Sequence, residues 1–78
     1  MDSARAEALT TARKLVRTLD AAPNPLQQAQ AAVAVLLRAT GWPGGHERKI
    51  LELADWLAQR PPPATLKARF RSLLETLD

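Results

Sequence analysis

Apolar residues recur at helical spacing in four segments of this chain, and short breaks containing Pro or Gly separate the segments. The breaks are Pro23-Asn24-Pro25, Gly41-Trp42-Pro43-Gly44-Gly45 and Pro61-Pro62-Pro63. Because apolar residues three and four apart lie on one face of an α-helix, each segment predicts one helix. The four predicted helices span residues 3–19, 25–40, 46–59 and 64–77. We therefore expect a single all-α domain, either a small four-helix bundle or an orthogonal helical array with short Pro/Gly turns.

The second segment has the clearest start and the most uniform composition. Asn24 is suited to cap the helix, Pro25 to occupy its first position, and Gln27 to complete an arrangement like a capping box. An unbroken run of apolar residues follows at positions 31–37. A helix that is apolar on almost every face belongs in the middle of a bundle, or has one face for a partner. We expect this helix to be the most deeply buried of the four.

The turn after the second helix contains two features of interest. Gly41 lies where a glycine often caps a helix, and Gly44-Gly45 is expected to form a flexible turn, since the Lys and Ser/Thr of phosphate-binding loops are absent. Trp42 has two interpretations, because a Trp in a turn can anchor a binding partner or fold back over the end of the bundle. Trp56, at the edge of its helix stripe, allows the same two interpretations.

The composition limits the classes of function. The chain has 78 residues, of which 46% are hydrophobic and none is Cys. That length supports one domain with a small core. The lack of Cys excludes disulfides and thiolate metal sites, and it indicates an intracellular setting, cytoplasmic or nuclear. No apolar run has the length of a membrane span, and we expect no signal peptide. The chain fits either a very small protein or the terminal domain of a larger one.

Candidate catalytic groups are few. His46 is the only histidine, and no nucleophile or orienting carboxylate accompanies it at a suitable spacing. Glu52 and Asp55 share one helix face but lack the His or Cys neighbours of a metal site. We therefore expect a protein that is not an enzyme and that needs no metal and no cofactor.

The net charge is +3, and the acidic residues are interspersed among the basic ones. Ordinary solubilising charge is one interpretation of this pattern. The alternative is a nucleic-acid surface on the first and fourth predicted helices, formed by Arg13, Lys14, Arg17, Lys67 and Arg71. Phosphate contacts need only cations on a rigid support. However, aromatic residues for base stacking are scarce, and the Pro61-Pro62-Pro63 turn is too stiff for a helix-turn-helix.

The first half of the chain is similar to a known family. Ala8-Leu9, Lys14-Leu15 and Leu19, then Asn24-Pro25 and a helix ending in Leu36-Leu37, resemble the start of the N-terminal domain shared by transcription elongation factor TFIIS and Elongin A. This resemblance implies a compact helical domain that docks disordered peptides. The later signature of the family, a run of the type Thr-x-x-Gly-x-x-Val-Asn-x-Leu-Arg-Lys, is absent after Thr40, so no site residue is carried over.

By exclusion, the sequence predicts a protein–protein interaction module that binds a helix or a short linear peptide, or a second copy of the chain. The expected contact residues are Val35, Trp42, Trp56, Arg69 and Arg71. The two arginines would steer acidic partners. A small basic protein that associates with nucleic acid is the less favoured alternative, and no membrane partner is expected. A helical inhibitor or immunity-type protein fits the same features, and nothing in the sequence separates it from the interaction module.

Overall fold

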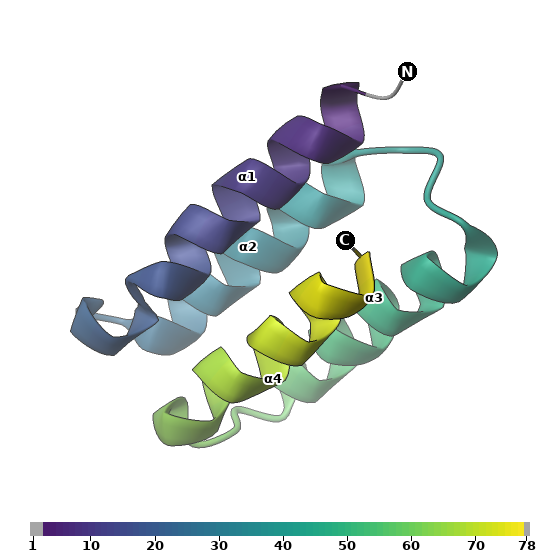
Figure 1. Cartoon of the computed structure of the whole chain (residues 1–78). Coiled ribbons are helices and arrows are strands. Elements are labelled where there is room, and N and C mark those ends of the chain that lie inside the picture. Colours follow the sequence, from purple (N-terminus) through teal and green to yellow (C-terminus); the bar gives the residue numbers. More distant parts are fainter. Residues whose placement is uncertain (1–2, 78) are drawn as a thin grey trace.

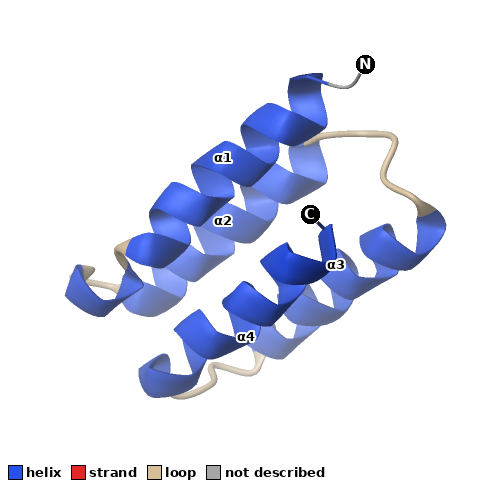
Figure 2. Ribbon diagram, in the orientation of Figure 1, coloured by secondary structure: helices blue, strands red, loops and turns tan. Residues whose placement is uncertain are grey.

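All four predicted helices are present in the computed structural model, which describes residues 3–77. They are α1 (Ser3–Arg17), α2 (Pro25–Arg38), α3 (Gly44–Ala58) and α4 (Pro63–Leu77), and a short 3₁₀ helix, η1 (Leu19–Ala21), follows α1. Residues 3–77 contain no strand (Figure 2). The predicted all-α fold is confirmed, and every predicted helix end lies within two residues of the observed one.

The helices alternate in direction along the chain and form two antiparallel hairpins, α1 with α2 and α3 with α4 (Figure 1). α2 and α4 each contact all the other helices, whereas within the described residues α1 does not approach α3. In this four-helix bundle α2 and α4 are therefore the diagonally opposite pair that is in contact, and α1 and α3 are the pair that is not. α1 and α4 are neighbours and pack side by side. The bundle measures 35 × 21 × 18 Å.

The core is entirely apolar within the described residues. Its largest fully buried side chains are Phe70, Leu36, Ile50, Leu57 and Leu66. Ala12 in α1 and Ala29 and Ala32 in α2 are also fully buried, and such small side chains allow two helices to approach closely. No buried polar side chain is found among residues 4–77, so hydrophobic burial, not a buried polar network, stabilises the fold.

The expectation that the second helix is the most deeply buried is wrong. Ala31, Ala34 and Leu37 of α2 face solvent, and Leu37 keeps 40% of its surface exposed. α4 buries more large side chains, namely Leu66, Phe70, Leu73, Leu74 and Leu77. The cause is that a helix in a four-helix bundle packs on one broad face only. An exposed Ala loses little by facing water, so the apolar run of α2 overstates its burial.

The start of α2 confirms the predicted cap. The Asn24 side chain accepts a hydrogen bond of 3.2 Å from the Gln27 backbone N–H, and Pro25 occupies the first turn. α3 differs from the prediction, because Gly44 and Gly45 belong to its first turn and do not form a flexible loop.

Pro43 provides the cap of α3, since its carbonyl accepts hydrogen bonds from the backbone N–H groups of His46 and Glu47. Gly41 has a φ of 84°, but it lies in the loop beyond Ala39, which is the C-cap of α2. A capping glycine occupies the residue directly after the C-cap, which is Thr40 here, so the expectation that Gly41 caps α2 is wrong by one position. Its positive φ lets the chain leave α2 and turn toward α3.

Arg60 has a left-handed backbone, with a φ of 55°. It follows the C-cap Gln59 of α3, and its N–H donates a hydrogen bond of 3.1 Å to the Leu57 carbonyl. Glycine is the usual residue at this position, because a side chain in the left-handed region costs about 1–2 kcal/mol.

We expect Arg60→Gly to stabilise the domain by about 0.5–1 kcal/mol, since the greater entropy of glycine in the unfolded chain offsets part of the relieved strain. The melting temperature, followed by circular dichroism, should rise by about 2–8 °C. Arg48→Gly is the matched control, because Arg48 is exposed inside α3 and glycine there should cost about 1 kcal/mol. A loss of stability in both variants would contradict the left-handed conformation of Arg60.

Candidate interaction groove between α1 and α4

A groove of about 500 Å³ lies between α1 and α4. The side chains that line it are Arg13, Val16, Arg17, Lys67, Arg71, Leu74 and Glu75. Each helix supplies two cations four residues apart, which places them one turn apart on one helix face. The bundle thus brings together two basic pairs that are distant in the sequence.

The groove has an apolar floor and basic rims. Val16 and Leu74 are each 6% exposed and belong to the core. Arg17 and Arg71 are exposed to solvent, and Lys67 is half-buried. A ligand in this groove therefore meets positive charge on both sides and the edges of two aliphatic side chains beneath it. This arrangement favours an anionic ligand that also carries apolar groups.

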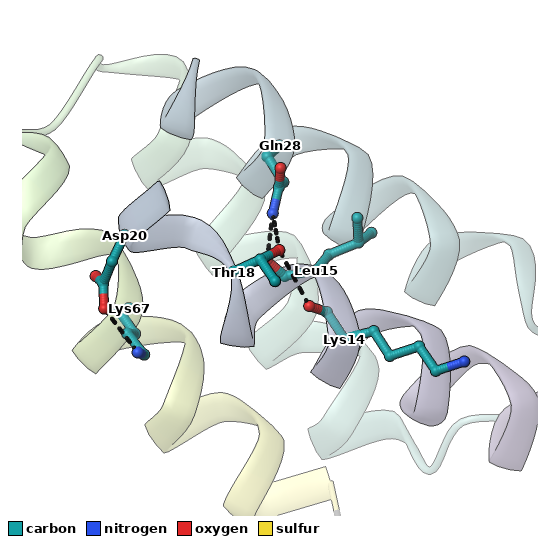
Figure 3. Close-up of polar contacts among 6 residues, drawn as sticks. All are labelled: Lys14, Leu15, Thr18, Asp20, Gln28 and Lys67. Carbon is teal, nitrogen blue, oxygen red and sulfur yellow. Dashed lines mark hydrogen bonds and ion pairs between the residues drawn. The ribbon is translucent and has the colours of Figure 1, made fainter. Parts of the chain in front are cut away.

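Carboxylates limit the basic stretch at both ends. In η1, beyond the last turn of α1, Asp20 Oδ2 lies 2.8 Å from Lys67 Nζ (Figure 3). Because α1 and α4 are antiparallel, Glu75 lies toward the opposite end, where its Oε1 is 3.9 Å from Arg71 Nε. All four side chains are at least 43% exposed, so these ion pairs contribute little to stability. Because Asp20 and Glu75 stand at the two ends, the basic stretch of the groove covers only about one turn of each helix.

Gln28 of α2 fixes the last turn of α1, and with it the position of the groove. Its Nε2 donates hydrogen bonds of 2.6 Å to the Leu15 carbonyl and 2.7 Å to Thr18 Oγ1 (Figure 3). Thr18 Oγ1 in turn donates to the Lys14 carbonyl at 3.3 Å. This network holds the end of α1 that carries Arg17 and leads to Asp20. Gln28 was not predictable from the sequence, because a Gln within an apolar helix has no distinctive motif.

The structure brings together four of the five residues proposed for nucleic-acid binding. Arg13, Arg17, Lys67 and Arg71 all line the groove, whereas Lys14 does not. In Figure 3 the Lys14 side chain extends away from the Asp20–Lys67 pair. The two clusters that the sequence showed on separate helices therefore line one groove, without Lys14.

The five residues expected to contact a partner protein do not form one surface. Val35 is half-buried in a hollow between α1 and α2 that also includes Glu7 and Arg38. Trp56 is half-buried in α3, and the Arg69 guanidinium lies 5.0 Å from the centre of its ring. Arg71 alone of this set lines the α1/α4 groove.

Trp42 covers the end of the bundle. It is 9% exposed, and its indole Nε1 donates a hydrogen bond of 2.9 Å to the Leu36 carbonyl. Arg5 lies above the ring at 6.0 Å from its centre and donates to the Gly41 carbonyl at 2.9 Å. The ring is thus part of the core, and its N–H is already bonded within the chain. This position supports the structural interpretation of Trp42 over the partner-anchor interpretation.

We expect Trp42→Phe to destabilise the domain by about 1–2 kcal/mol, because the buried Leu36 carbonyl loses its donor and the smaller ring leaves space. Trp56→Phe is the matched control, since Trp56 is only half-buried, and its cost should stay below about 1 kcal/mol. Urea unfolding followed by circular dichroism measures both. Equal costs for the two variants would contradict the buried hydrogen bond of Trp42.

Comparison with known proteins finds no matching family model, no similar curated protein and no similar solved structure. The resemblance of the first half to the TFIIS and Elongin A domain stays a prediction. Within residues 3–77, no group of three or more His, Cys, Asp or Glu side chains is placed to hold a metal ion. The helices of the same range are too short or too polar to cross a membrane.

Proposed function

We propose that this protein is a non-enzymatic interaction module, and that its α1/α4 groove binds an acidic peptide segment of a partner protein. The observation that supports this function is the convergence of Arg13, Arg17, Lys67 and Arg71 around one groove with Val16 and Leu74 at its floor. Four cations that surround one groove concentrate positive potential there, and such a potential attracts acidic ligands.

The limited length of the basic stretch favours a peptide over a nucleic acid. A DNA duplex carries one negative charge per about 1.7 Å of its axis, so its phosphates extend well past one helical turn. Beyond the cations they would approach Asp20 at one end and Glu75 at the other, and both carboxylates are exposed. A short acidic segment can place its charges on the cations alone.

The expected affinity is modest. Each exposed ion pair contributes about 0.2–1 kcal/mol, and complementary charge accelerates association more than it strengthens binding. With limited apolar contact at the floor, a dissociation constant between about 10 µM and 1 mM is expected. Binding should weaken as salt screens the charges.

Fluorescence anisotropy tests this function directly. A labelled acidic peptide and a labelled DNA duplex with the same number of negative charges are titrated with the protein at about 50 and 200 mM salt. We expect the peptide to bind at the lower salt concentration, and to bind at least as tightly as the duplex. Tighter binding of the duplex, with a steep salt dependence, would favour the nucleic-acid alternative. Binding of neither probe would overturn the proposed function.

A further inference from the structure

We infer that the occupant of the α1/α4 groove is an amphipathic helix with a row of carboxylates on each side of a narrow apolar ridge. This inference rests on the proposed function and specifies the form of the ligand. The groove lies between α1 and α4, and these two helices run antiparallel (Figure 1). A third helix can lie along such a groove, which is a recurrent mode of peptide recognition.

The spacing of the cations determines the pattern of the ligand. Arg13 and Arg17 are four residues apart on one rim, and Lys67 and Arg71 are four residues apart on the other. Residues four apart on any α-helix are separated by about 6 Å along the helix axis, so this distance is the same in a helical ligand as in α1 and α4. A helix in the groove therefore matches each rim with its own pair of carboxylates spaced i, i+4. An extended peptide advances about 3.3 Å per residue and alternates its side chains, so it can meet both rims, but then none of its side chains faces the floor. A helix presents both acidic rows and a third row of side chains toward Val16 and Leu74.

The floor determines what lies between the two acidic rows. Val16 and Leu74 reach the surface only slightly, at 6% each, so the ridge of the ligand meets a narrow strip. Aliphatic side chains at the a and d positions of a heptad form such a ridge. Carboxylates at positions b and e then lie on one flank, and those at c and g lie on the other.

Asp20 and Glu75 stand at the two ends of the groove, and we expect the acidic rows to extend over no more than about two turns.

The ion pairs of Lys67 and Arg71 do not prevent this binding. Lys67 is paired with Asp20, and Arg71 lies near Glu75, but these carboxylates are 73% and 74% exposed. Exposed pairs of this kind are worth less than about 1 kcal/mol. Carboxylates of a helical ligand can replace or share these contacts at little cost.

The test uses two synthetic peptides of identical composition and similar helix propensity. The two-row peptide has Leu at a and d over about two heptads, and it has Glu at b, c, e and g only within its two central turns. The shuffled peptide distributes the same residues evenly around the helix. Titration calorimetry with the intact protein at about 50 mM salt compares them. We expect the two-row peptide to bind roughly tenfold more tightly or better, a difference of about 1.4 kcal/mol.

Each outcome has a distinct meaning. Equal affinity of the two peptides would overturn the inference about the helical ligand, while the proposed function as a binder of acidic peptides would stand. Binding of neither peptide would overturn both. A variant checks the orientation of the peptide. Arg17→Glu should weaken binding of the two-row peptide. A second peptide, with Lys in place of Glu on one flank only, should then bind the Arg17→Glu variant with recovered affinity. Recovery by a Lys placed on either flank would contradict a fixed two-row arrangement.

Discussion

Leu36→Ala is expected to lower the free energy of unfolding by about 2–5 kcal/mol, whereas Leu37→Ala should lower it by less than about 1 kcal/mol. The two residues are adjacent in α2 and chemically identical, so they form a matched pair. Leu36 is fully buried in the core, and Leu37 keeps 40% of its surface exposed. Removal of Leu36 leaves a cavity beside the carbonyl that holds Trp42, whereas removal of Leu37 leaves none.

The expected effect of Leu36→Ala is large relative to the total stability. A domain of 78 residues has a free energy of unfolding of about 4–12 kcal/mol. The melting temperature of Leu36→Ala should therefore fall by roughly 10 °C or more, and that of Leu37→Ala by only a few degrees. Thermal and urea unfolding by circular dichroism measure both. An equal loss for Leu37→Ala would contradict the exposed outer face of α2, and a loss that depends on protein concentration would indicate that a second copy covers this face.

Reversal of two groove cations, Arg17→Glu together with Arg71→Glu, should weaken binding of the two-row peptide roughly tenfold or more. Each reversal removes an attraction and adds a repulsion, and like charges placed together strongly disfavour a ligand. The matched control is Lys14→Glu together with Arg48→Glu, which changes the net charge by the same amount at positions outside the groove. We expect this control to weaken binding about threefold or less, through long-range charge alone.

The comparison is interpretable only if all the variants fold. Arg17, Arg71, Lys14 and Arg48 are exposed, so both double variants should melt within a few degrees of the parent protein. Titration calorimetry at about 50 and 200 mM salt then separates local contacts from net charge. An equal loss of affinity in the two double variants would show that the peptide responds to the overall charge of the chain and not to the groove.

The helices of this protein are predictable from its sequence because their boundaries depend on local chemistry. Asn24 caps α2 through its own side chain. Pro25 and Pro63 are the first residues of α2 and α4, a position where proline is favoured because no helical hydrogen bond needs its N–H. Pro61 and Pro62 lack the N–H that would continue α3. The exposed face of α2 was not predictable in the same way, since Ala31 and Ala34 are compatible with either a buried or an exposed position.

The groove depends on tertiary packing, and the sequence showed only its parts. Arg17 and Lys67 line one groove because α1 packs against α4, a pairing that no local pattern encodes. The environment of Trp42 depends in the same way on the carbonyl of Leu36, toward which the loop after α2 returns. Gln28 forms its contacts across two helices. These features required the arrangement of the helices, not only their existence.

The measurement that tests the central claim most directly is an amide-shift titration of the ¹⁵N-labelled protein with the two-row peptide. The groove residues lie at positions 13–17 of α1 and 67–75 of α4. We expect the largest shift changes there and in η1, and only small changes along the exposed face of α2 and in α3. An unchanged spectrum at millimolar peptide, or changes centred on α2 and α3, would contradict the assignment of the α1/α4 groove as the binding site.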